Sequence, residues 1–334
     1  MAIKAGQLKE RADYQAYILE MLREENGYQV RPSTAYDPGY GMDVELLFSF
    51  LQATQPDALT RLEKLYGDKT RQTILNYINN EVNKKNRSLL DVLKHGVEFD
   101  NGVSLTLMYR KPATTFNQKA EALYQQNALS VMEEVWHKED ERIDLVIFLN
   151  GIAVFTFELK CNTSGQNYEY AIRQYNFERD YKTRLLKFKA GCLAHFAMDL
   201  NEVYMCTNLK GKSSFFLPFN KGCGVGIHSG KGNPHNENGI NVSYMWEDIL
   251  KKDTVLYLID KIIFLQKETK KDPDTGKRVT KETLIFPRYH QFNAVRKLVA
   301  DVRQKGAGQH YLIQHSAGSG KSNSIAWTAY RLAS

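Results

Sequence analysis

Two carboxylates and a lysine stand close together in the most apolar stretch of the sequence. Thirteen residues separate Asp144 from Glu158, and Lys160 follows two positions later. Carboxylates held side by side repel each other and favour a divalent cation, and hard oxygen ligands suit Mg2+. A lysine beside that ion can orient or deprotonate a water and offset the charge that builds on a phosphoryl oxygen. This cluster is therefore a candidate site for metal-assisted phosphodiester hydrolysis.

The elements that must position this cluster are expected to form a hairpin. Residues 142–149 and 152–160 are mostly apolar and flank Asn150-Gly151, a dipeptide typical of a tight turn. Because both strands are apolar on both faces, we expect them at the centre of a covered sheet. Glu158 and Lys160 then share one face of their strand.

The register of this hairpin decides whether the two carboxylates meet. A two-residue turn pairs Asp144 with Phe157 and points Asp144 away from Glu158. A three-residue loop over 149–151, with Gly151 left-handed and bulged, makes the two acids diagonal neighbours on one face, about 7–8 Å apart between Cα atoms. If the two acids form a metal site, this hairpin must therefore contain a bulge or a strong bend.

The alternative to a functional site is a strand end whose charges simply reach solvent. An acid two positions before a lysine occurs three times, at Glu158, Asp180 and Glu268. Only Glu158 emerges from an apolar strand with an acid on the partner strand. A carboxylate in a buried strand is costly unless it is paired or metal-bound, which favours the functional interpretation.

A second motif predicts a phosphate-binding loop near the end of the chain. An apolar strand is expected over 310–314, followed by a glycine turn, Gly320-Lys321-Ser322 and a helix from Lys321. Backbone N–H groups and the helix N-terminus can cradle phosphates, Lys321 can reach the terminal ones, and Ser322 can hold Mg2+. His315 replaces the usual first glycine, and the alternative is a chance glycine turn. The candidate nucleotide contacts are Gln291, Gly318, Ser319, Gly320, Lys321 and Ser322.

Gln291 joins this set because its amide can pair with both edges of adenine; the alternative is an ordinary helix start after Pro287. The sequence ends twelve residues after Ser322, before any downstream acidic strand that would complete a motor. We therefore expect residues 283–334 to be the first fragment of a motor domain, and the sequence to be a truncation.

Hydrophobic periodicity elsewhere predicts an α/β arrangement. The expected helices are 7–24, 42–51, 59–66, 118–127, 168–187, 246–266 and 288–305. Further strands are expected at 131–136, 192–198 and 203–208, with a hairpin within 99–109 and a hairpin or flexible link over 267–282. The predicted helix 168–187 is rich in arginine, lysine and tyrosine, so it is either a DNA-phosphate surface or a solvated face with core tyrosines.

Composition narrows the class of protein. The 334 residues carry 45 basic and 38 acidic side chains, a net charge of +7 that permits a polyanionic partner. No apolar run approaches the ~20 residues needed to cross a bilayer, and no signal peptide is visible, so no membrane partner is expected. Four separated cysteines argue against a disulfide framework or a structural zinc site and suit a cytoplasmic protein.

Taken together, these segments resemble the N-terminal part of the restriction (R) subunit of type I restriction-modification enzymes. The stretches that carry the resemblance are Phe148–Ile152, Phe157–Lys160, Thr163–Gln166, Tyr170–Tyr175, Phe219–Gly222, Gly232–Pro234, Phe286–Gln291 and Tyr311–Ser322. The resemblance covers most of the chain and is strongest from about residue 95 onward.

The resemblance implies a PD-(D/E)xK nuclease, a mixed sheet flanked by helices, followed by a RecA-like superfamily-2 translocase. The nuclease domain would span 1–250 with its core at 116–250, residues 251–282 would form a helix and linker, and 283–334 would begin the translocase. Asp144 and Glu158 would bind the metal, and Lys160 and Gln174 would be catalytic. The family's Gln-x-x-x-Tyr element has Glu178 in place of the tyrosine here, and neighbouring Tyr175 is the possible substitute. Ile143 replaces the usual proline.

The implied activity is Mg2+-dependent cleavage of double-stranded DNA after ATP-driven translocation, in a complex with methylase and specificity subunits. Two rival functions stay open at the sequence level. One is a P-loop phosphotransferase or small ATPase, and the other is a non-catalytic DNA-binding or assembly module with an inactive nuclease site.

Overall fold

The computed structural model describes residues 5–8, 11–114, 116–162, 165–223, 231–271, 276–316 and 318–333. Three features of the sequence therefore lie partly outside the described residues. These are the Thr163-Ser164 pair of the family-like stretches, residues 272–275 of the hairpin or link expected over 267–282, and Ala317 of the glycine turn.

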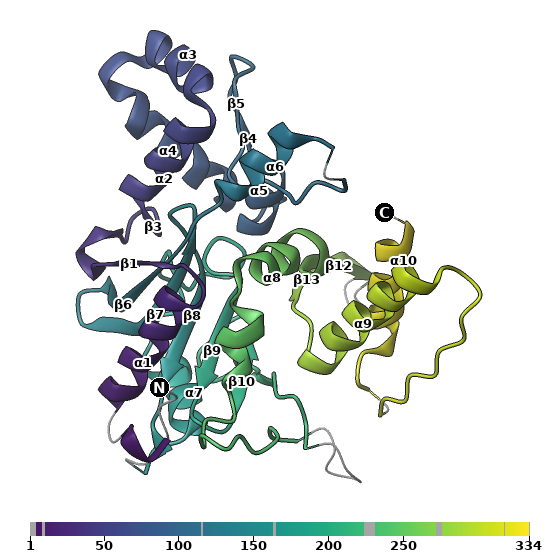
Figure 1. Ribbon diagram of the computed structural model, residues 1–334. Helices are drawn as coiled ribbons and strands as arrows, with labels where there is room; N and C mark the ends of the chain where they lie inside the picture. Colours follow the sequence, from purple (N-terminus) through teal and green to yellow (C-terminus); the bar gives the residue numbers. More distant parts are fainter. Residues whose placement is uncertain are drawn as a thin grey trace.

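A mixed sheet of nine strands forms the centre of the molecule (Figure 1). Its main path is, in order, β1 (Gln29–Arg31), β6 (Leu129–Lys138), β7 (Glu141–Leu149), β8 (Ile152–Leu159), β9 (Ala194–Met198), β10 (Val203–Cys206) and β11 (Leu217–Pro218). The short strands β2 (Tyr36–Asp37) and β3 (Met42–Asp43) lie off this path, and β3 pairs with β8. The β1–β6 and β8–β9 pairs are parallel, whereas the other pairs are antiparallel.

The expected hairpin lies at the centre of this sheet, as β7 and β8. Every residue of β8 is buried, and so are the last seven of β7. Alternate residues pack into two hydrophobic clusters, with Val146 and Phe148 on one face and Leu145 and Ile147 on the other. The prediction of a central strand pair covered on both faces is confirmed.

The register of the hairpin differs from both expected versions. Leu149 pairs with Ile152, so the turn has two residues, and the expected three-residue loop over 149–151 is wrong. Ile147 pairs with Phe155 but Phe148 pairs with Ala153, which leaves Val154 as an extra residue in β8. The predicted bulge therefore exists, but within a strand instead of at the turn.

The tertiary surroundings explain why the turn stays tight. Asn150 and Gly151 both have positive φ, of 51° and 82°, as a two-residue hairpin turn requires. The Asn150 side chain accepts a hydrogen bond from Ala128 N at 2.8 Å and donates one to Leu107 O at 2.9 Å. A Cβ on Gly151 would lie 2.5 Å from Asp43 O and from Leu47 N, so only glycine fits there.

Helices surround the sheet and build the rest of the described chain. They are α1 (Arg11–Glu24), α2 (Val44–Thr54), α3 (Pro56–Tyr66), α4 (Thr70–Asn83), α5 (Leu89–His95), α6 (Gln118–Gln125), α7 (Tyr168–Phe177), α8 (Lys252–Tyr257), α9 (Tyr289–Lys305) and α10 (Lys321–Ala333). In Figure 1, α2–α4 extend at one end of the molecule and α9–α10 lie at its side. The expectation of a mixed α/β fold flanked by helices is confirmed, and none of the described helices is long and apolar enough to cross a membrane.

Two expected helices end early. The helix expected over 168–187 ends at Phe177, because the following residues turn away and Arg179 and Leu185 pack against the sheet. The helix expected over 246–266 is two π-helical turns, Met245–Ile249 and Leu258–Ile262, around the short α8. Phe264 then starts a two-stranded hairpin, β12 (Phe264–Lys271) and β13 (Arg278–Ile285), which was one of the two alternatives expected over 267–282.

The C-terminal segment contains both expected helices but not the expected strand. Residues 310–314 have no strand structure, and Leu312 is 95% exposed. Among the described residues no strand lies beside them, and an isolated strand leaves its backbone N–H and C=O groups without partners. Helices α9 and α10 pack on the remainder of the chain: Phe292 and Trp327 join its main hydrophobic cluster, and Trp327 Nε1 donates to Ile262 O at 2.8 Å.

Candidate active site

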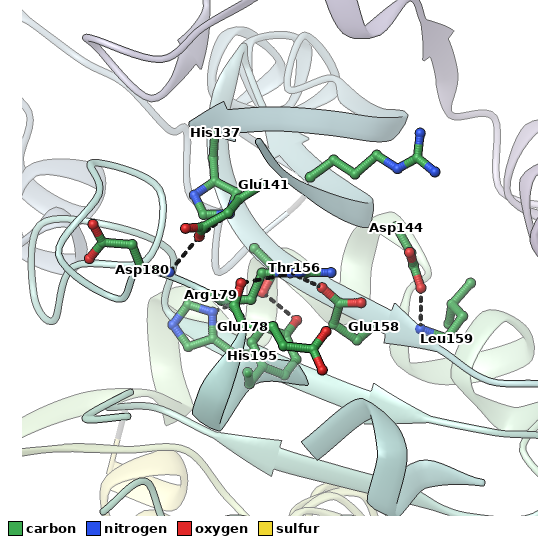
Figure 2. Close-up of polar contacts among 12 residues, drawn as sticks. His137, Glu141, Asp144, Thr156, Glu158, Leu159, Glu178, Arg179, Asp180 and His195 are labelled. Atoms are coloured by element: carbon green, nitrogen blue, oxygen red, sulfur yellow. Dashed lines mark hydrogen bonds and ion pairs between the residues drawn. The ribbon is translucent and has the colours of Figure 1, made fainter. Parts of the chain in front are cut away.

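The bulge in β8 brings the two acids of the candidate site to one face of the sheet. Leu145 pairs with Phe157, so the next step of the register sets Asp144 across from Glu158. They are thus direct cross-strand neighbours and not the diagonal ones expected from the sequence. Figure 2 shows both carboxylates beside β8, and each residue has 0% exposure. Two buried carboxylates therefore lie next to each other at the centre of the sheet.

The Asp144 carboxylate is held by one backbone group and one arginine. Its Oδ2 accepts a hydrogen bond from Leu159 N at 2.8 Å, which ties β7 to the end of β8 (Figure 2). Its Oδ1 lies 2.5 Å from Arg11 Nη1 at the start of α1, and the same guanidinium contacts Glu134 of β6 at 3.0 Å. Arg11 thereby offsets the charge of Asp144 from the partly exposed side.

The Glu158 carboxylate has one satisfied oxygen and one open one. Its Oε1 accepts a hydrogen bond from Arg179 Nε at 2.7 Å, and the Arg179 side chain is only 10% exposed (Figure 2). Its Oε2 is buried and has no hydrogen-bond partner among the described residues. A buried carboxylate oxygen without a donor is costly, so its retention marks a place where another positive group can sit.

Lys160 follows directly after β8, on the face that carries Glu158. It is 5% exposed, and its backbone N–H donates to Met198 O at 2.9 Å. Its ammonium forms no hydrogen bond or ion pair with any side chain in the described part of the chain. Burial lowers the pKa of Lys160, against the opposing charges of Asp144 and Glu158. The Lys160 ammonium therefore feels the charges of both acids but forms no ion pair with either of them.

Burial also controls the ionisation of Glu158. It raises the pKa of this carboxyl, the charge of Asp144 raises it further, and Arg179 opposes both effects. Glu158 therefore resists ionisation, and a further cation beside its open oxygen would favour the charged form.

The helix α7 adds an amide and a tyrosine to this face. Gln174 is half-buried, and its Oε1 has no hydrogen-bond partner among the described residues. Tyr175 is fully buried, and its Oη lies 2.8 Å from Thr156 Oγ1. Thr156 in turn lies 2.8 Å from His195 Nδ1, and burial lowers the pKa of His195 to about 3, which keeps that ring neutral. Tyr175 thus anchors α7 onto the strand that carries Glu158.

The basic segment after α7 does not form one helical surface. Arg179 turns inward to Glu158, and Arg184 is held by Asn79 Oδ1 at 3.0 Å and by Ala190 O. Glu178, at the position of the missing tyrosine, is exposed. The DNA-binding helix considered over 168–187 is therefore not supported, since Tyr175 is packed in the core and both Arg179 and Arg184 are bound within the protein.

Two residues of the site could not be found by reading the sequence. Arg11 is 133 positions from Asp144, and Arg179 is 21 positions from Glu158, so no local spacing links either pair. An arginine-rich segment was visible around Arg179, but its direction depends on where α7 ends. Only the folded chain shows that each carboxylate has its own guanidinium.

The candidate nucleotide loop is compact around Gln291. The Gln291 Oε1 accepts from Arg288 N at 2.8 Å, and its Nε2 donates to Gly320 O at 2.8 Å. Lys321 Nζ donates to His315 O at 3.1 Å and to Ser316 O at 3.0 Å. Gly318 and Gly320 have positive φ, Ser319 is buried, and Ser322 lies in the first turn of α10. The structure thus brings Gln291 of α9 against the loop that leads into α10, with Lys321 folded back onto the loop carbonyls.

Comparison with known proteins identifies the family. Residues 7–214 match the family described as type I restriction enzyme R protein N terminus. This match covers more than half of the chain, so the chain belongs to that family, as the sequence resemblance predicted.

A similar protein supports the same assignment. A candidate type I restriction enzyme MjaVIIIP endonuclease subunit from Methanocaldococcus jannaschii is 26% identical to this chain over 284 residues. The similarity covers 79% of this chain and 24% of that protein, so the chain spans about a quarter of the length of that relative.

Proposed function

We propose that this chain provides the Mg2+-dependent DNA nuclease of a type I restriction enzyme. The observation that carries the proposal is the pair of buried carboxylates, Asp144 and Glu158, on adjacent strands beside the buried Lys160. Burying this much charge on one sheet face costs stability, and structures tolerate that cost mainly at functional sites. Membership of the restriction R-protein family supports the same activity.

The donor set fits a divalent cation of the Mg2+ type. The open, buried Oε2 of Glu158 offers one hard oxygen ligand, and Asp144 across from it offers another. No cluster of three or more His, Cys, Asp or Glu side chains suited to a metal occurs in the described part of the chain. Two carboxylates are nevertheless enough for Mg2+, which usually keeps several waters and takes further ligands from substrate phosphates.

The side chains of the site would divide the work of hydrolysis. When bound, the ion would stabilise charge on the scissile phosphate and lower the pKa of a water. Lys160, whose pKa is lowered by burial, would orient that water and accept or share its proton. The free Oε1 of Gln174 would accept a hydrogen bond from the same water, with α7 held in place through Tyr175 and Thr156.

The two arginines would change partners during this process. Arg11 and Arg179 offset the charges of Asp144 and Glu158 in the structure, and a bound cation would take over that task. A released guanidinium beside the site is well suited to bind a phosphate in a bidentate way.

We further propose that residues 283–334 begin an ATP-driven DNA translocase. Lys321 and Ser322 would contact the nucleotide phosphates and its Mg2+, and Gln291 would contact adenine. The partners would be double-stranded DNA and the methylase and specificity subunits of the restriction complex. When ATP binds, Lys321 Nζ would exchange its hydrogen bonds to the loop carbonyls for contacts with phosphate oxygens.

The test uses the complete restriction complex with plasmid DNA, Mg2+ and ATP. Replacing Asp144, Glu158 or Lys160 by alanine should reduce cleavage by at least about 100-fold, while ATP-driven translocation continues. Asp140→Ala, which removes an exposed carboxylate from the β6–β7 turn, is the matched control and should cleave normally. Lost translocation with normal cleavage in the site variants would refute the assignment.

Lys321→Ala should stop translocation and therefore cleavage.

One observation favours a second candidate function. Each carboxylate already has an arginine, so the same charges could form an inert ion-pair network in a DNA-binding or assembly module. Calorimetric titration with Mg2+ separates the two functions, because an inert ion-pair network binds no Mg2+. If the network is inert, Glu158→Gln should also leave DNA cleavage by the complex unchanged.

A further inference from the structure

Much of the positive charge of the chain gathers in a hairpin and two segments beside it. Residues 81–87, 187–189, 264–271 and 276–285 contain eleven lysines and arginines against three acidic residues, while the whole chain has a net charge of +7. Residues 272–275, which connect the two strands in sequence, add two aspartates and lie outside the described residues. The hairpin is β12–β13, which Figure 1 labels between α8 and α10.

The register of the hairpin places three of these cations on one face. Lys267 pairs with Glu282 and Lys271 with Arg278, and residues two apart on a strand share a face. Lys267, Lys271 and Arg278 are all exposed. The four-residue step from Lys267 to Lys271 spans about 13 Å at roughly 3.3 Å per residue.

Lys189 joins this face to the neighbouring segments. Its Nζ lies 2.6 Å from a Glu282 carboxylate oxygen of β13 and donates to Lys85 O at 2.9 Å. Its φ of 69° is unusual for a lysine, and its carbonyl accepts a hydrogen bond from Leu89 N at 2.6 Å. Lys189 therefore joins the hairpin to the segment that follows α4.

We call this surface the basic band. Its members are Lys85, Lys187, Lys189, Lys267, Lys271 and Arg278. Glu282 is the acid at its centre, and that carboxylate is already matched by Lys189 and Lys267. Within the described residues, the side chains of Lys85, Lys271 and Arg278 have no carboxylate partner. Among the described residues, the band thus carries exposed positive charge without a carboxylate partner at these three side chains.

We propose that the basic band binds the phosphate backbone of duplex DNA. Exposed lysine and arginine side chains on one face of a hairpin match the dense charge of a duplex, and the step of about 13 Å matches the rise of about four base pairs at about 3.4 Å each. The described part of the hairpin beyond Phe264 has no aromatic side chain, so it lacks the stacking surface typical of single-strand binding. Such contacts position the duplex without reading its sequence.

The band is also linked to the candidate active site along the chain. The segment that ends at Lys189 begins at Arg179, which holds Glu158. Arg184 fastens the middle of this segment to Asn79 of α4. DNA bound at the band would thus rest on the same segment that borders the nuclease site. This inference rests on the proposed function in one respect, since the nuclease assignment is what identifies the bound polyanion as DNA.

The test measures binding of a 30-base-pair duplex by fluorescence anisotropy, in EDTA so that cleavage plays no part. The triple variant Lys267→Gln, Lys271→Gln, Arg278→Gln should bind at least about tenfold more weakly at low salt. The slope of log affinity against log salt should fall by about 0.9 for each phosphate that is no longer neutralised, hence by about 2.7 for three. A matched control removes the same number of charges elsewhere, as Arg61→Gln, Lys64→Gln, Lys69→Gln in and just after α3, and should keep the parent slope.

Several outcomes would overturn the proposal: no duplex binding by the parent chain, an unchanged slope in the band variant, or an equal loss in the control. Protection of Lys267 and Lys271 from acetylation by bound duplex gives a second readout that needs no variant, and unprotected lysines would also overturn it. Asp144→Ala separates this inference from the proposed function, because it should keep duplex binding while it abolishes cleavage. An Asp144→Ala variant that still cleaves would refute the nuclease assignment and leave the band intact.

Discussion

Removing Arg179 should make the stability of the protein strongly dependent on pH. Arg179→Ala leaves the Glu158 carboxylate buried without its cation, and breaking such a buried pair costs about 3–5 kcal/mol while the carboxylate stays charged. At low pH the raised pKa keeps this carboxyl protonated in both proteins, so the loss there is that of a hydrogen bond to a neutral group, about 1 kcal/mol. The excess loss at high pH is therefore about 2–4 kcal/mol.

The direction of this pH dependence of stability follows from proton binding by Glu158. Burial and Asp144 raise the pKa of this carboxyl in the folded state, so the folded chain binds a proton that the unfolded chain has already released. Stability from this group is then present at low pH and is lost as pH rises through the raised pKa. Removing Arg179 raises that pKa further and so deepens the loss at high pH.

The assay is urea unfolding followed by tryptophan fluorescence, at pH 5.5 and pH 8.5 in EDTA. Arg173→Ala, which removes an exposed arginine from α7, is the control and should behave like the parent at both pH values. Added Mg2+ should restore stability to Arg179→Ala, by about 2.7 kcal/mol at a hundredfold excess over its Kd. Equal destabilisation at the two pH values would refute the interpretation of Glu158 as a buried charge held by Arg179.

Three further predictions test the turn, the anchor of α7 and the nucleotide loop. Gly151→Ala should cost more than about 2 kcal/mol in unfolding free energy, because its Cβ would overlap Asp43 O and Leu47 N, whereas Gly102→Ala meets no atom within 4 Å and should cost about 1 kcal/mol. Tyr175→Phe should cost about 1 kcal/mol because it removes the hydrogen bond to Thr156, and an unchanged urea midpoint would contradict this. Gln291→Ala should weaken binding of a fluorescent ATP analogue about tenfold in the full-length subunit, since it removes a hydrogen bond to the base of about 1.4 kcal/mol. The exposed Gln304→Ala should leave that affinity unchanged, and equal affinities for all three proteins would exclude a nucleotide role for Gln291.

The elements nearest the site could be predicted because local rules dominate there. Asn150-Gly151 between two apolar runs specifies a hairpin, and runs apolar on both faces specify a central strand pair. The helices at 289–305 and 321–333 follow from periodicity and from the glycines that precede or follow them.

Other elements depended on contacts that no local pattern contains. α7 ends at Phe177 because Arg179 is drawn to Glu158, although the following residues would suit a longer helix. Residues 310–314 suit a strand by composition, but strand structure requires a neighbouring strand, and none lies beside them in the described chain. The roles expected for the acids and lysine of the candidate active site, for Gln174 and for the residues of the nucleotide loop all stay predictions.

The sequence by itself determined the chemical groups and the strands that carry them. Asp144, Glu158 and Lys160 lie in or next to two adjacent strands whatever their register, because the turn and the apolar runs are local properties. Only the tertiary structure decided that the acids meet, because the extra residue Val154 is accommodated by packing on both faces of the sheet and shifts the parity of β8. Arg11 and Arg179 likewise reach the acids only in the folded chain. A charge in the low-polarity interior must be paired with an opposite charge, and folding can supply that partner from a distant part of the sequence.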